Sequence, residues 1–576
     1  MSTDTVNGEV CEDMKQAEQQ DDLAVTRAFA PIFKEIRSLD EVYGVIADIL
    51  LGGKIDDLTE AKKIIDKASK NATLSILYTI FKDIFYRKNG EGIPFVVAIE
   101  SFYIDPTYRD SYYLHFSSKH FALSRYCMRL FFLDMPALEN HIFSKSEEEL
   151  NKIFIGSSVL RPSVESEYIV GKTLLNPFKF DQFKNKHICV SPYHVSMFSK
   201  RLHTVAFPYM MQDGEVITCA ETTILHMCDY YSNRYNMYKS VTPSEIARIE
   251  EPFTHQRIVP SEGLSYKSVS QILMKLNFYP RLYGFEDKEP AAQRKRIMHC
   301  YIDSAIPVAV SLTPKGEKTE AHSVVCIGMP TQYPYDSKYV FSNEECFCLN
   351  MADLNTEYII MDDSSAPYVN MTFEIDQDKP ENQMIQIDGK GNEFSLTSLI
   401  APLSKRMFVD ALDAYEIALQ VISGSEIGFT KAVEPLGEKS IYYNVGRTED
   451  NPLIFRLLLA RASSFRRKRS HDMKNKTSFV WQTYNSIPLP KFVWICELYS
   501  KESLKHNKVI GEIVIDATAD KFAGISSVVL LNYPHRFAFR LPEEKLSSFQ
   551  YRFREKELES WEELNPYRHL RDLDGA

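Results

Sequence analysis

The sequence predicts an α+β protein of several domains. Its 576 residues exceed what one hydrophobic core usually supports, so two to four domains are expected. The hydrophobic pattern changes period along the chain: helical spacing gives way to strand-like runs from about residue 94. Near residue 219 a predicted helix is followed by several strand-like runs. One helix packed on an antiparallel sheet is an α+β arrangement.

The composition is that of an ordinary globular protein, 44% hydrophobic and 25% charged. The net charge of -11 makes nucleic acid an unexpected partner, because nucleic-acid binders are usually basic. No apolar run approaches the roughly 18 residues of a membrane helix, and the acidic, polar N-terminus lacks the pattern of a secretory signal. Ten scattered cysteines indicate reduced thiols and a cytoplasmic location.

The first part of the chain is predicted as a disordered acidic tail, 1–22, and an N-terminal α+β domain, 23–150. The tail is rich in Asp, Glu and Gln and has too few apolar side chains to order itself. Up to about residue 90 the pattern is helical, with helices opening at Asp40 and Asp57 and a third carrying Leu74 to Ile84. Strands are then expected at 93–99 and 111–116, joined by a turn at Asp105–Pro106.

The central domain is predicted to span 151–424. Strands should lead into a polar loop and a helix from Cys219 to about Asn233, and a second helix should run from Gly263 to Leu276. Buried strands follow, and Asp362 ends the last of them. The expected strands are 154–162, 171–175, 187–191, 202–207, 307–312 and 322–328.

A C-terminal α+β domain is predicted at 425–576. It should begin with a helix at 452–468 and end with a charged, helical tail after 542. Four strands are expected between them, at 491–499, 508–517, 526–533 and 535–541.

Cys219 is the candidate nucleophile. Most cysteines are small buried hydrophobes, but a polar loop precedes this one and small Ala220 follows it. A thiol in the first turn of a helix lies at the positive end of the helix dipole, which favours the thiolate. Gln212, seven residues upstream, can supply a side-chain amide to an oxyanion, together with the Cys219 backbone N–H.

His322 is the candidate base, and Asp362 is its orienting residue, with Asp363 as the alternative. A histidine on an apolar strand is most often a core residue, but here the next predicted strand ends in a pair of carboxylates. A neutral imidazole can take the proton of a thiol, and its second nitrogen then needs an acceptor that fixes the tautomer. Only one of the two aspartates can face His322, because side chains alternate along a strand.

These segments resemble papain-like cysteine peptidases, most closely the bacteriocin-processing type and its bacterial peptidase-like relatives. That family has a Gln, a Cys opening a helix, a His on a strand and an Asp closing the next strand. The resemblance covers about residues 200–370. It implies a papain-like catalytic domain in which Gln212 serves the oxyanion, Cys219 attacks, His322 is the base and Asp362 orients it.

The sequence therefore predicts a thiol hydrolase that cleaves a peptide or isopeptide amide, with a peptide or protein substrate and no cofactor or metal. Two alternatives stay open: acyl transfer of the transglutaminase or deamidase type by the same triad, and a catalytically silent binding module. Ala220, where a glycine often follows the cysteine, suits the silent alternative. The flanking domains are possible sites for a partner protein or a cover over the cleft.

Other motifs are interpreted more plainly. The basic cluster Arg466–Arg469 is expected to be a solvated helix end, where cations suit the negative end of the dipole. Cys346 and Cys348 lack the ligand spacing of a zinc site. The sequence carries no phosphate-binding glycine loop and no HExxH motif.

Overall fold

The computed structural model describes residues 31–51, 72–138, 142–164, 168–255, 257–285, 290–316, 321–343, 345–376, 379, 381–520, 522–540, 554–558 and 561–568. The fold is mixed α+β with several antiparallel sheets, as predicted. The chain forms two compact units. Unit 1 comprises Met1–Lys184, Val190–Gly263 and Asp363–Pro367, and unit 2 comprises Asn185–Cys189, Leu264–Asp362 and Tyr368–Ala576. The predicted tail and the predicted helix start at Asp57 lie outside the described residues.

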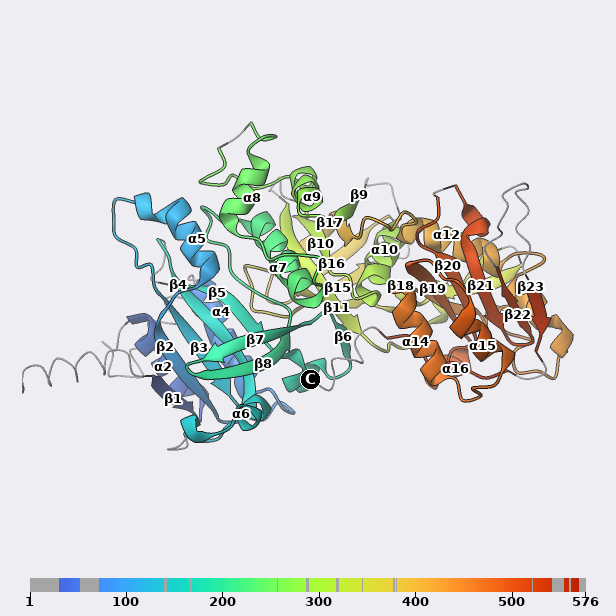
Figure 1. Cartoon of the computed structure of the whole chain (residues 1–576), viewed down its shortest axis with the longest axis horizontal. Coiled ribbons are helices and arrows are strands. Elements are labelled where there is room, and N and C mark those ends of the chain that lie inside the picture. Colours follow the sequence, from blue (N-terminus) through green and yellow to red (C-terminus); the bar gives the residue numbers. More distant parts are fainter. Residues whose placement is uncertain are drawn as a thin grey trace, which may run out of the picture. The chain divides into compact units, whose positions relative to one another are not determined.

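Unit 1 is built on a five-stranded antiparallel sheet (Figure 1). The strands pair in chain order, so each is joined to its neighbour in sequence. They are β1 (Ile32–Ile36), β2 (Phe95–Tyr103), β3 (Cys127–Leu133), β4 (Phe154–Pro162) and β5 (Tyr168–Leu175). The predicted boundary at 150/151 therefore falls inside one sheet, between β3 and β4.

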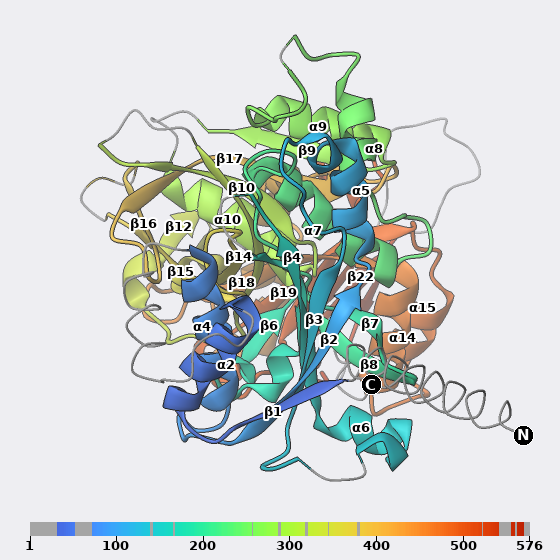
Figure 2. The same cartoon turned by 90° about the vertical axis from the view of Figure 1, so that its left-hand side faces the viewer.

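Both faces of this sheet are covered, because successive side chains point to opposite faces. On one face, Phe81 of α4 (Ala72–Phe85) packs edge-on against Phe132, with ring centroids 5.5 Å apart. On the other face, Phe131 shares a buried cluster with residues of the hairpin β7 (Ser191–Met197) and β8 (Lys200–Ala206). Figure 2 shows α4 beside α2 (Leu39–Leu51).

The predicted strand at 111–116 is wrong: these residues lie in α5 (Pro106–Leu114) and the short 3-10 helix Phe116–Ser118. Asp105 caps α5 by accepting the Tyr108 N–H at 2.8 Å, and Pro106 occupies the first turn. Asp followed by Pro is therefore a helix start here, since proline suits the first helical position.

Unit 1 also holds α6 (Glu147–Ile153), α7 (Cys219–Arg234) and α8 (Pro243–Glu250).

Unit 2 contains a sheet that closes on itself. Strands β10, β11, β14, β15, β16 and β17 pair in that order, and β10 pairs again with β17. β6 extends the sheet from β11, and β9 extends it from β17. The bounds are β6 (Lys186–Ile188), β9 (Tyr279–Gly284), β10 (Val308–Pro314), β11 (His322–Pro330), β14 (Glu357–Met361), β15 (Val369–Ile375), β16 (Gln383–Ile387) and β17 (Glu393–Leu403).

A second sheet of unit 2 takes strands from two distant parts of the chain. Its order is β12-β13-β18-β19-β20-β21-β22-β23, antiparallel except for the pair β13 and β18. The bounds are β12 (Phe341–Asn343), β13 (Cys346–Asn350), β18 (Leu453–Arg461), β19 (Phe492–Tyr499), β20 (Gly511–Asp516), β21 (Val528–Tyr533), β22 (Arg536–Phe539) and β23 (Arg554–Glu557). Because β12 and β13 precede residue 424, this sheet crosses the predicted boundary at 424/425.

Two predictions in this region are wrong. The helix expected at 452–468 is β18 followed by α14 (Ala462–Asp472). β18 is a buried inner strand, and a short run that is apolar on both faces does not distinguish a strand from a helix. The helical tail expected after 542 is wrong for the part that the structure describes: residues 554–557 form β23, an exposed and charged edge strand, and 543–553, 559–560 and 569–576 lie outside the described residues. Charged side chains on an edge strand are a common way to protect a sheet edge.

The remaining helices of unit 2 border these sheets. Its α-helices are α9 (Tyr266–Lys275), α10 (Ala291–Asp303), α11 (Met351–Leu354), α12 (Ala411–Ile422), α13 (Phe429–Val433), α15 (Phe479–Ser486) and α16 (Lys501–Lys505), besides α14. In the part of the chain that the structure describes, no helix is both long and apolar enough to cross a membrane.

The basic cluster Arg466–Arg469 is only partly solvated. Arg467 is exposed, but Arg469 is fully buried and holds two buried carboxylates. Its guanidinium donates to Glu512 Oε2 at 2.5 and 2.8 Å and to Glu497 Oε1 at 2.8 Å. The expectation of a solvated helix end is thus wrong for Arg469, whose charge balances acids on β19 and β20.

We predict that Arg469→Ala destabilises the protein by roughly 3–5 kcal/mol. The substitution leaves buried Glu512 without its cation and removes one of the two cations of buried Glu497, which still pairs with Arg456. Arg467→Ala, two residues away on the same helix, should change stability by less than about 0.5 kcal/mol. Urea unfolding followed by circular dichroism measures both. Equal effects of the two substitutions would show that the buried pairing does not stabilise this sheet.

Candidate active site

Cys219 is the first residue of α7, as the sequence predicts. Among the cysteines that the structure describes, it alone is not buried. The helix start is closed by Glu221, whose Oε2 accepts the Thr218 N–H at 3.2 Å and also binds the Thr218 hydroxyl. Ser261 Oγ donates to the other oxygen of Glu221 at 2.6 Å. The thiol is therefore carried by a well-anchored first turn, at the positive end of the helix dipole.

The loop between Gln212 and Cys219 is a compact turn centred on Asp213. Asp213 Oδ1 accepts the backbone N–H groups of Glu215, Val216 and Ile217 at 3.0, 2.7 and 2.9 Å. Gly214 has a φ of 72°, in the left-handed region that glycine adopts without strain. Three converging N–H donors hold the loop in one conformation, which leaves Gln212 half-buried at its start.

A buried ion pair and a buried imidazole hold the chain on both sides of Gln212. Arg161, 2% exposed, reaches Asp213 Oδ2 at 3.3 Å and donates to the Met211 carbonyl. His226 of α7 accepts the Met210 N–H on Nε2 at 2.9 Å. Burial lowers the pKa of His226 to about 3, so the ring is neutral and can act as an acceptor. Sequence reasoning missed this histidine, although it lies on the same helix as Cys219.

A further segment of unit 1 binds the same loop. Glu215 lies 2.6 Å from His115 Nε2 and also pairs with Lys119. Both partners flank the short helix that follows α5. Burial would raise the pKa of Glu215, but these two partners outweigh it and hold the pKa below its usual value. Residues around 115–119 are thus part of the surroundings of the Cys219 loop.

His322 and Asp362 form a hydrogen-bonded pair within unit 2. His322 is the first residue of β11, and Asp362 directly follows β14, the strand that pairs with β11. His322 Nε2 lies 2.8 Å from Asp362 Oδ1. The histidine side chain is 19% exposed and that of the aspartate is fully buried. The order of the strands explains the pairing, because Val325 stands opposite Met361 in the register.

Asp362 has a second partner, Lys390. This lysine lies in the turn between β16 and β17 and places Nζ 2.6 Å from Asp362 Oδ2. Gly389 before it has a φ of 81°. Burial alone would raise the pKa of Asp362, but the hydrogen bonds and charges of His322 and Lys390 hold it well below its usual value. The carboxylate is therefore ionised, with one oxygen on the imidazole and the other on the ammonium.

The predicted site residues thus form two groups, one in each unit. Gln212 and Cys219 belong to unit 1, whereas His322 and Asp362 belong to unit 2. Asp363, the alternative orienting residue, is 2% exposed and begins the unit 1 segment Asp363–Pro367. Histidine and aspartate are also metal ligands, but Lys390 already occupies one oxygen of Asp362, and its positive charge disfavours a metal ion beside it.

Comparison with known proteins assigns no family to this chain. No protein-family model matches it, and no curated protein matches it. The chemistry must therefore be argued from these residues themselves.

We predict that buried His226 makes the protein less stable in mild acid. The folded state keeps the ring neutral down to about pH 3, whereas the unfolded chain protonates it near 6.5. The stability that the neutral ring contributes is complete well above pH 6.5. Below pH 6.5 the free energy of unfolding decreases as the pH falls, with a slope that approaches about 1.4 kcal/mol per pH unit. His226→Gln, which does not titrate, should lose about 1 kcal/mol less than the wild type between about pH 6.5 and 5.5 in urea unfolding.

The control is His120→Gln, which replaces an exposed histidine of the same unit and should keep the wild-type slope. A wild-type slope in His226→Gln would mean that His226 is not held neutral by burial.

Proposed function

We propose that this protein is a papain-like cysteine hydrolase that cleaves a peptide or isopeptide amide. Cys219 is the nucleophile, His322 the general base and acid, Asp362 the residue that orients it, and Gln212 an oxyanion donor. The observation that carries the proposal is the 2.8 Å hydrogen bond between His322 Nε2 and buried Asp362. The resemblance of these segments to the bacteriocin-processing type of peptidase also supports it.

The pairing selects the tautomer that a thiol needs. An ionised Asp362 accepts hydrogen bonds only, so His322 must carry its proton on Nε2. The lone pair is then on Nδ1, which is the nitrogen that can take a proton from a thiol. When Nδ1 becomes protonated, the buried carboxylate stabilises the imidazolium next to it. Lys390 keeps the carboxylate ionised and fixes its second oxygen.

The Cys219 group of residues offers the complementary parts. Among the cysteines of the described residues, Cys219 is the one that is not buried, and it lies in the first turn of α7. Backbone N–H groups of the first turn lack partners within their helix, so the Cys219 N–H can donate to an oxyanion. The Gln212 amide is a second donor, and the turn around Asp213 fixes the spacing between the two. Two converging donors are the usual means of stabilising a tetrahedral intermediate.

The reaction then runs in two halves. The Cys219 thiolate forms a bond to the amide carbonyl carbon, and the tetrahedral intermediate collapses by breaking the C–N bond. His322 gives its Nδ1 proton to the leaving amine, which leaves a thioester on Cys219. Water, deprotonated by His322, attacks this thioester, releases the carboxylic acid and returns the thiol. An amine in place of water would give acyl transfer.

The substrate class follows from this chemistry. A peptide or protein amide is the proposed substrate. The buried free cysteines of both units suit a reducing compartment, so a cytoplasmic site of action is part of the proposal. A partner protein bound to the regions outside the catalytic residues is a further part of it, because such regions commonly gate active sites.

In the direct experiment, the full chain is incubated with a peptide library derived from a proteome. New termini of the peptides are then identified by mass spectrometry. We expect cleavage by the wild type and a loss of at least 1,000-fold in Cys219→Ala, since the covalent step disappears. Cys228→Ala changes a buried cysteine on the same helix and should cleave like the wild type. Cleavage that persists in Cys219→Ala would contradict the assignment. No cleavage by any form would favour a silent binding module.

We predict that Lys390→Met lowers the cleavage rate about tenfold, equivalent to about 1.4 kcal/mol in the activation free energy. The reason is that Asp362 loses the cation that fixes one of its oxygens. Lys390→Arg, which keeps the charge, should recover most of the rate. Lys315→Met removes a half-exposed lysine paired with Glu393 in unit 2 and serves as the control. Equal rates in Lys390→Met and the control would exclude a positioning role for Lys390.

A further inference from the structure

A cavity of about 380 Å³ lies in unit 2, in a region that the hydrolase proposal does not use. It is bordered by the segment that follows β11, by helix α16 and by the residues around 566–568. Pockets that bind small molecules usually range from about 300 to 1,000 Å³, so the space suits an organic molecule. A lone inorganic ion would fill only a small part of it.

The charged side chains of the cavity are mostly cationic. Lys501, Lys505, Arg456 and Arg568 line it, whereas Asp303 is the one carboxylate among its lining residues. Asp303 is fully engaged, because Arg456 binds both of its oxygens at 2.6 Å. The pKa of Asp303 falls to about 2, since Arg456 outweighs the effect of burial. Asp303 therefore has little capacity to neutralise the lysines.

The two lysines are available to a ligand. Among the residues that the structure describes, Lys501 makes no ion pair, and its Nζ lies 4.4 Å from the centroid of the Tyr335 ring. Lys505 lies 3.1 Å from Glu502, but both of these side chains are about two-thirds exposed. Exposed pairs of this kind contribute little, so Lys505 can exchange Glu502 for a ligand anion at low cost.

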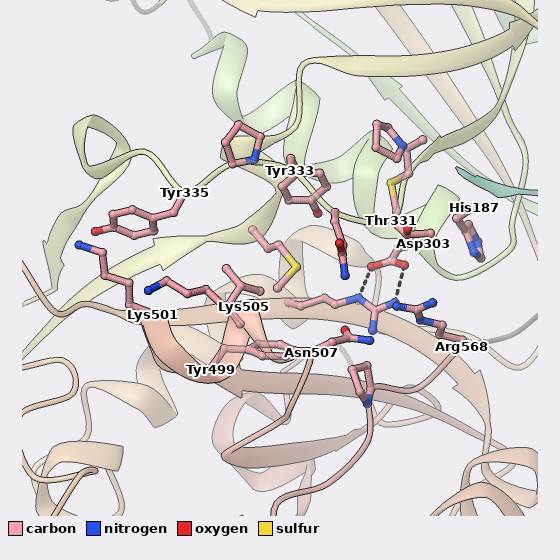
Figure 3. A pocket seen from close by; sticks show the side chains of 18 residues that line it. His187, Asp303, Thr331, Tyr333, Tyr335, Tyr499, Lys501, Lys505, Asn507 and Arg568 are labelled. Atoms are coloured by element: carbon pink, nitrogen blue, oxygen red, sulfur yellow. Dashed lines mark hydrogen bonds and ion pairs between the residues drawn. The ribbon is translucent and has the colours of Figure 1, made fainter. Parts of the chain in front are cut away.

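Aromatic rings form the middle of the cavity. Figure 3 shows Lys501, Lys505 and Tyr335 at one end, Asp303, His187 and Arg568 at the other, and Tyr333 and Tyr499 between them. The hydroxyls of the two central tyrosines are engaged by the protein: that of Tyr333 lies 3.3 Å from His299 Nε2, and that of Tyr499 donates to Glu497 at 2.7 Å. The half-buried Tyr333 ring is thus held in place as a flat apolar surface, whereas Tyr499 is only 2% exposed and forms part of the cavity wall.

We propose that this cavity binds a nucleoside phosphate. Lys501 and Lys505 would hold the phosphate groups, and the base would lie against Tyr333, whose side chain is half-buried. Stacking on aromatic side chains is favourable for every nucleobase, and the side-chain amide of Asn507, which also lines the cavity, can hydrogen-bond a base edge. This inference is independent of the proposed hydrolase activity, because none of these residues belongs to the Cys219 or His322 groups.

The test is isothermal titration calorimetry of the full chain with ATP, tripolyphosphate and adenosine. ATP should bind at least tenfold more tightly than either of the other two, because only ATP uses both the lysines and Tyr333. The double substitution Lys501→Glu and Lys505→Glu should weaken ATP binding at least tenfold. The matched control, Lys439→Glu with Lys474→Glu, makes the same change in net charge at two exposed lysines outside the cavity and should bind ATP within twofold of the wild type.

Three results would overturn the proposal. The first is no binding of ATP to the wild type. The second is an equal loss in both double variants, which would mean a general effect of net charge. The third is tripolyphosphate binding as tightly as ATP, which would reduce the site to a simple anion site. Tyr333→Ala gives an additional check, because it should weaken ATP at least tenfold and leave tripolyphosphate unchanged.

Discussion

The proposed chemistry depends on one constraint: Asp362 carries a charge although its side chain is fully buried. An isolated carboxylate in that position would take up a proton. It stays ionised because each of its oxygens has its own partner, an imidazole on one side and an ammonium on the other. The charge in turn dictates which nitrogen of His322 holds the proton. The base, its tautomer and its orientation all follow from this carboxylate.

The Cys219 group meets a different requirement, which is a rigid backbone around the thiol. The Asp213 carboxylate accepts three backbone N–H groups. The neutral His226 ring accepts the Met210 N–H. Glu221 closes the helix start. Each of these contacts fixes backbone rather than the thiol itself. Such an arrangement leaves Cys219 accessible while its surroundings stay ordered, as preorganised catalysis requires.

The sequence predicted the features that are local in the chain. The start of α7 at Cys219 was predictable because a polar loop precedes an amphipathic run, and the strand ending at Asp362 carries its own apolar signal. The structure pairs His322 with Asp362, a contact that two neighbouring strands bring about. Lys390 was not predictable, because it reaches Asp362 only through the turn between β16 and β17, and nothing in its neighbours marks that contact.

The errors have physical causes as well. β18 was predicted as a helix because its residues are apolar on both faces. Such a run shows neither the helical nor the strand period of hydrophobicity. At Asp105–Pro106 the same residues suit a turn or a helix cap, and only the tertiary structure decides between them. The cavity at Lys501 and Tyr333 joins segments about 170 residues apart. No local sequence pattern predicts such a site, because its lysines and tyrosines come together only in the folded chain.

The most direct measurement is the pH dependence of alkylation of Cys219 by iodoacetamide, followed by mass spectrometry of its peptide. If His322 activates this thiol, the wild type should react rapidly well below the pH at which an ordinary thiol ionises, near 8.5. His322→Ala should lose the fast reaction at acidic pH and follow the profile of an unassisted thiol. Identical profiles in the wild type and in His322→Ala would contradict the account, because they would mean that the two residues do not act together.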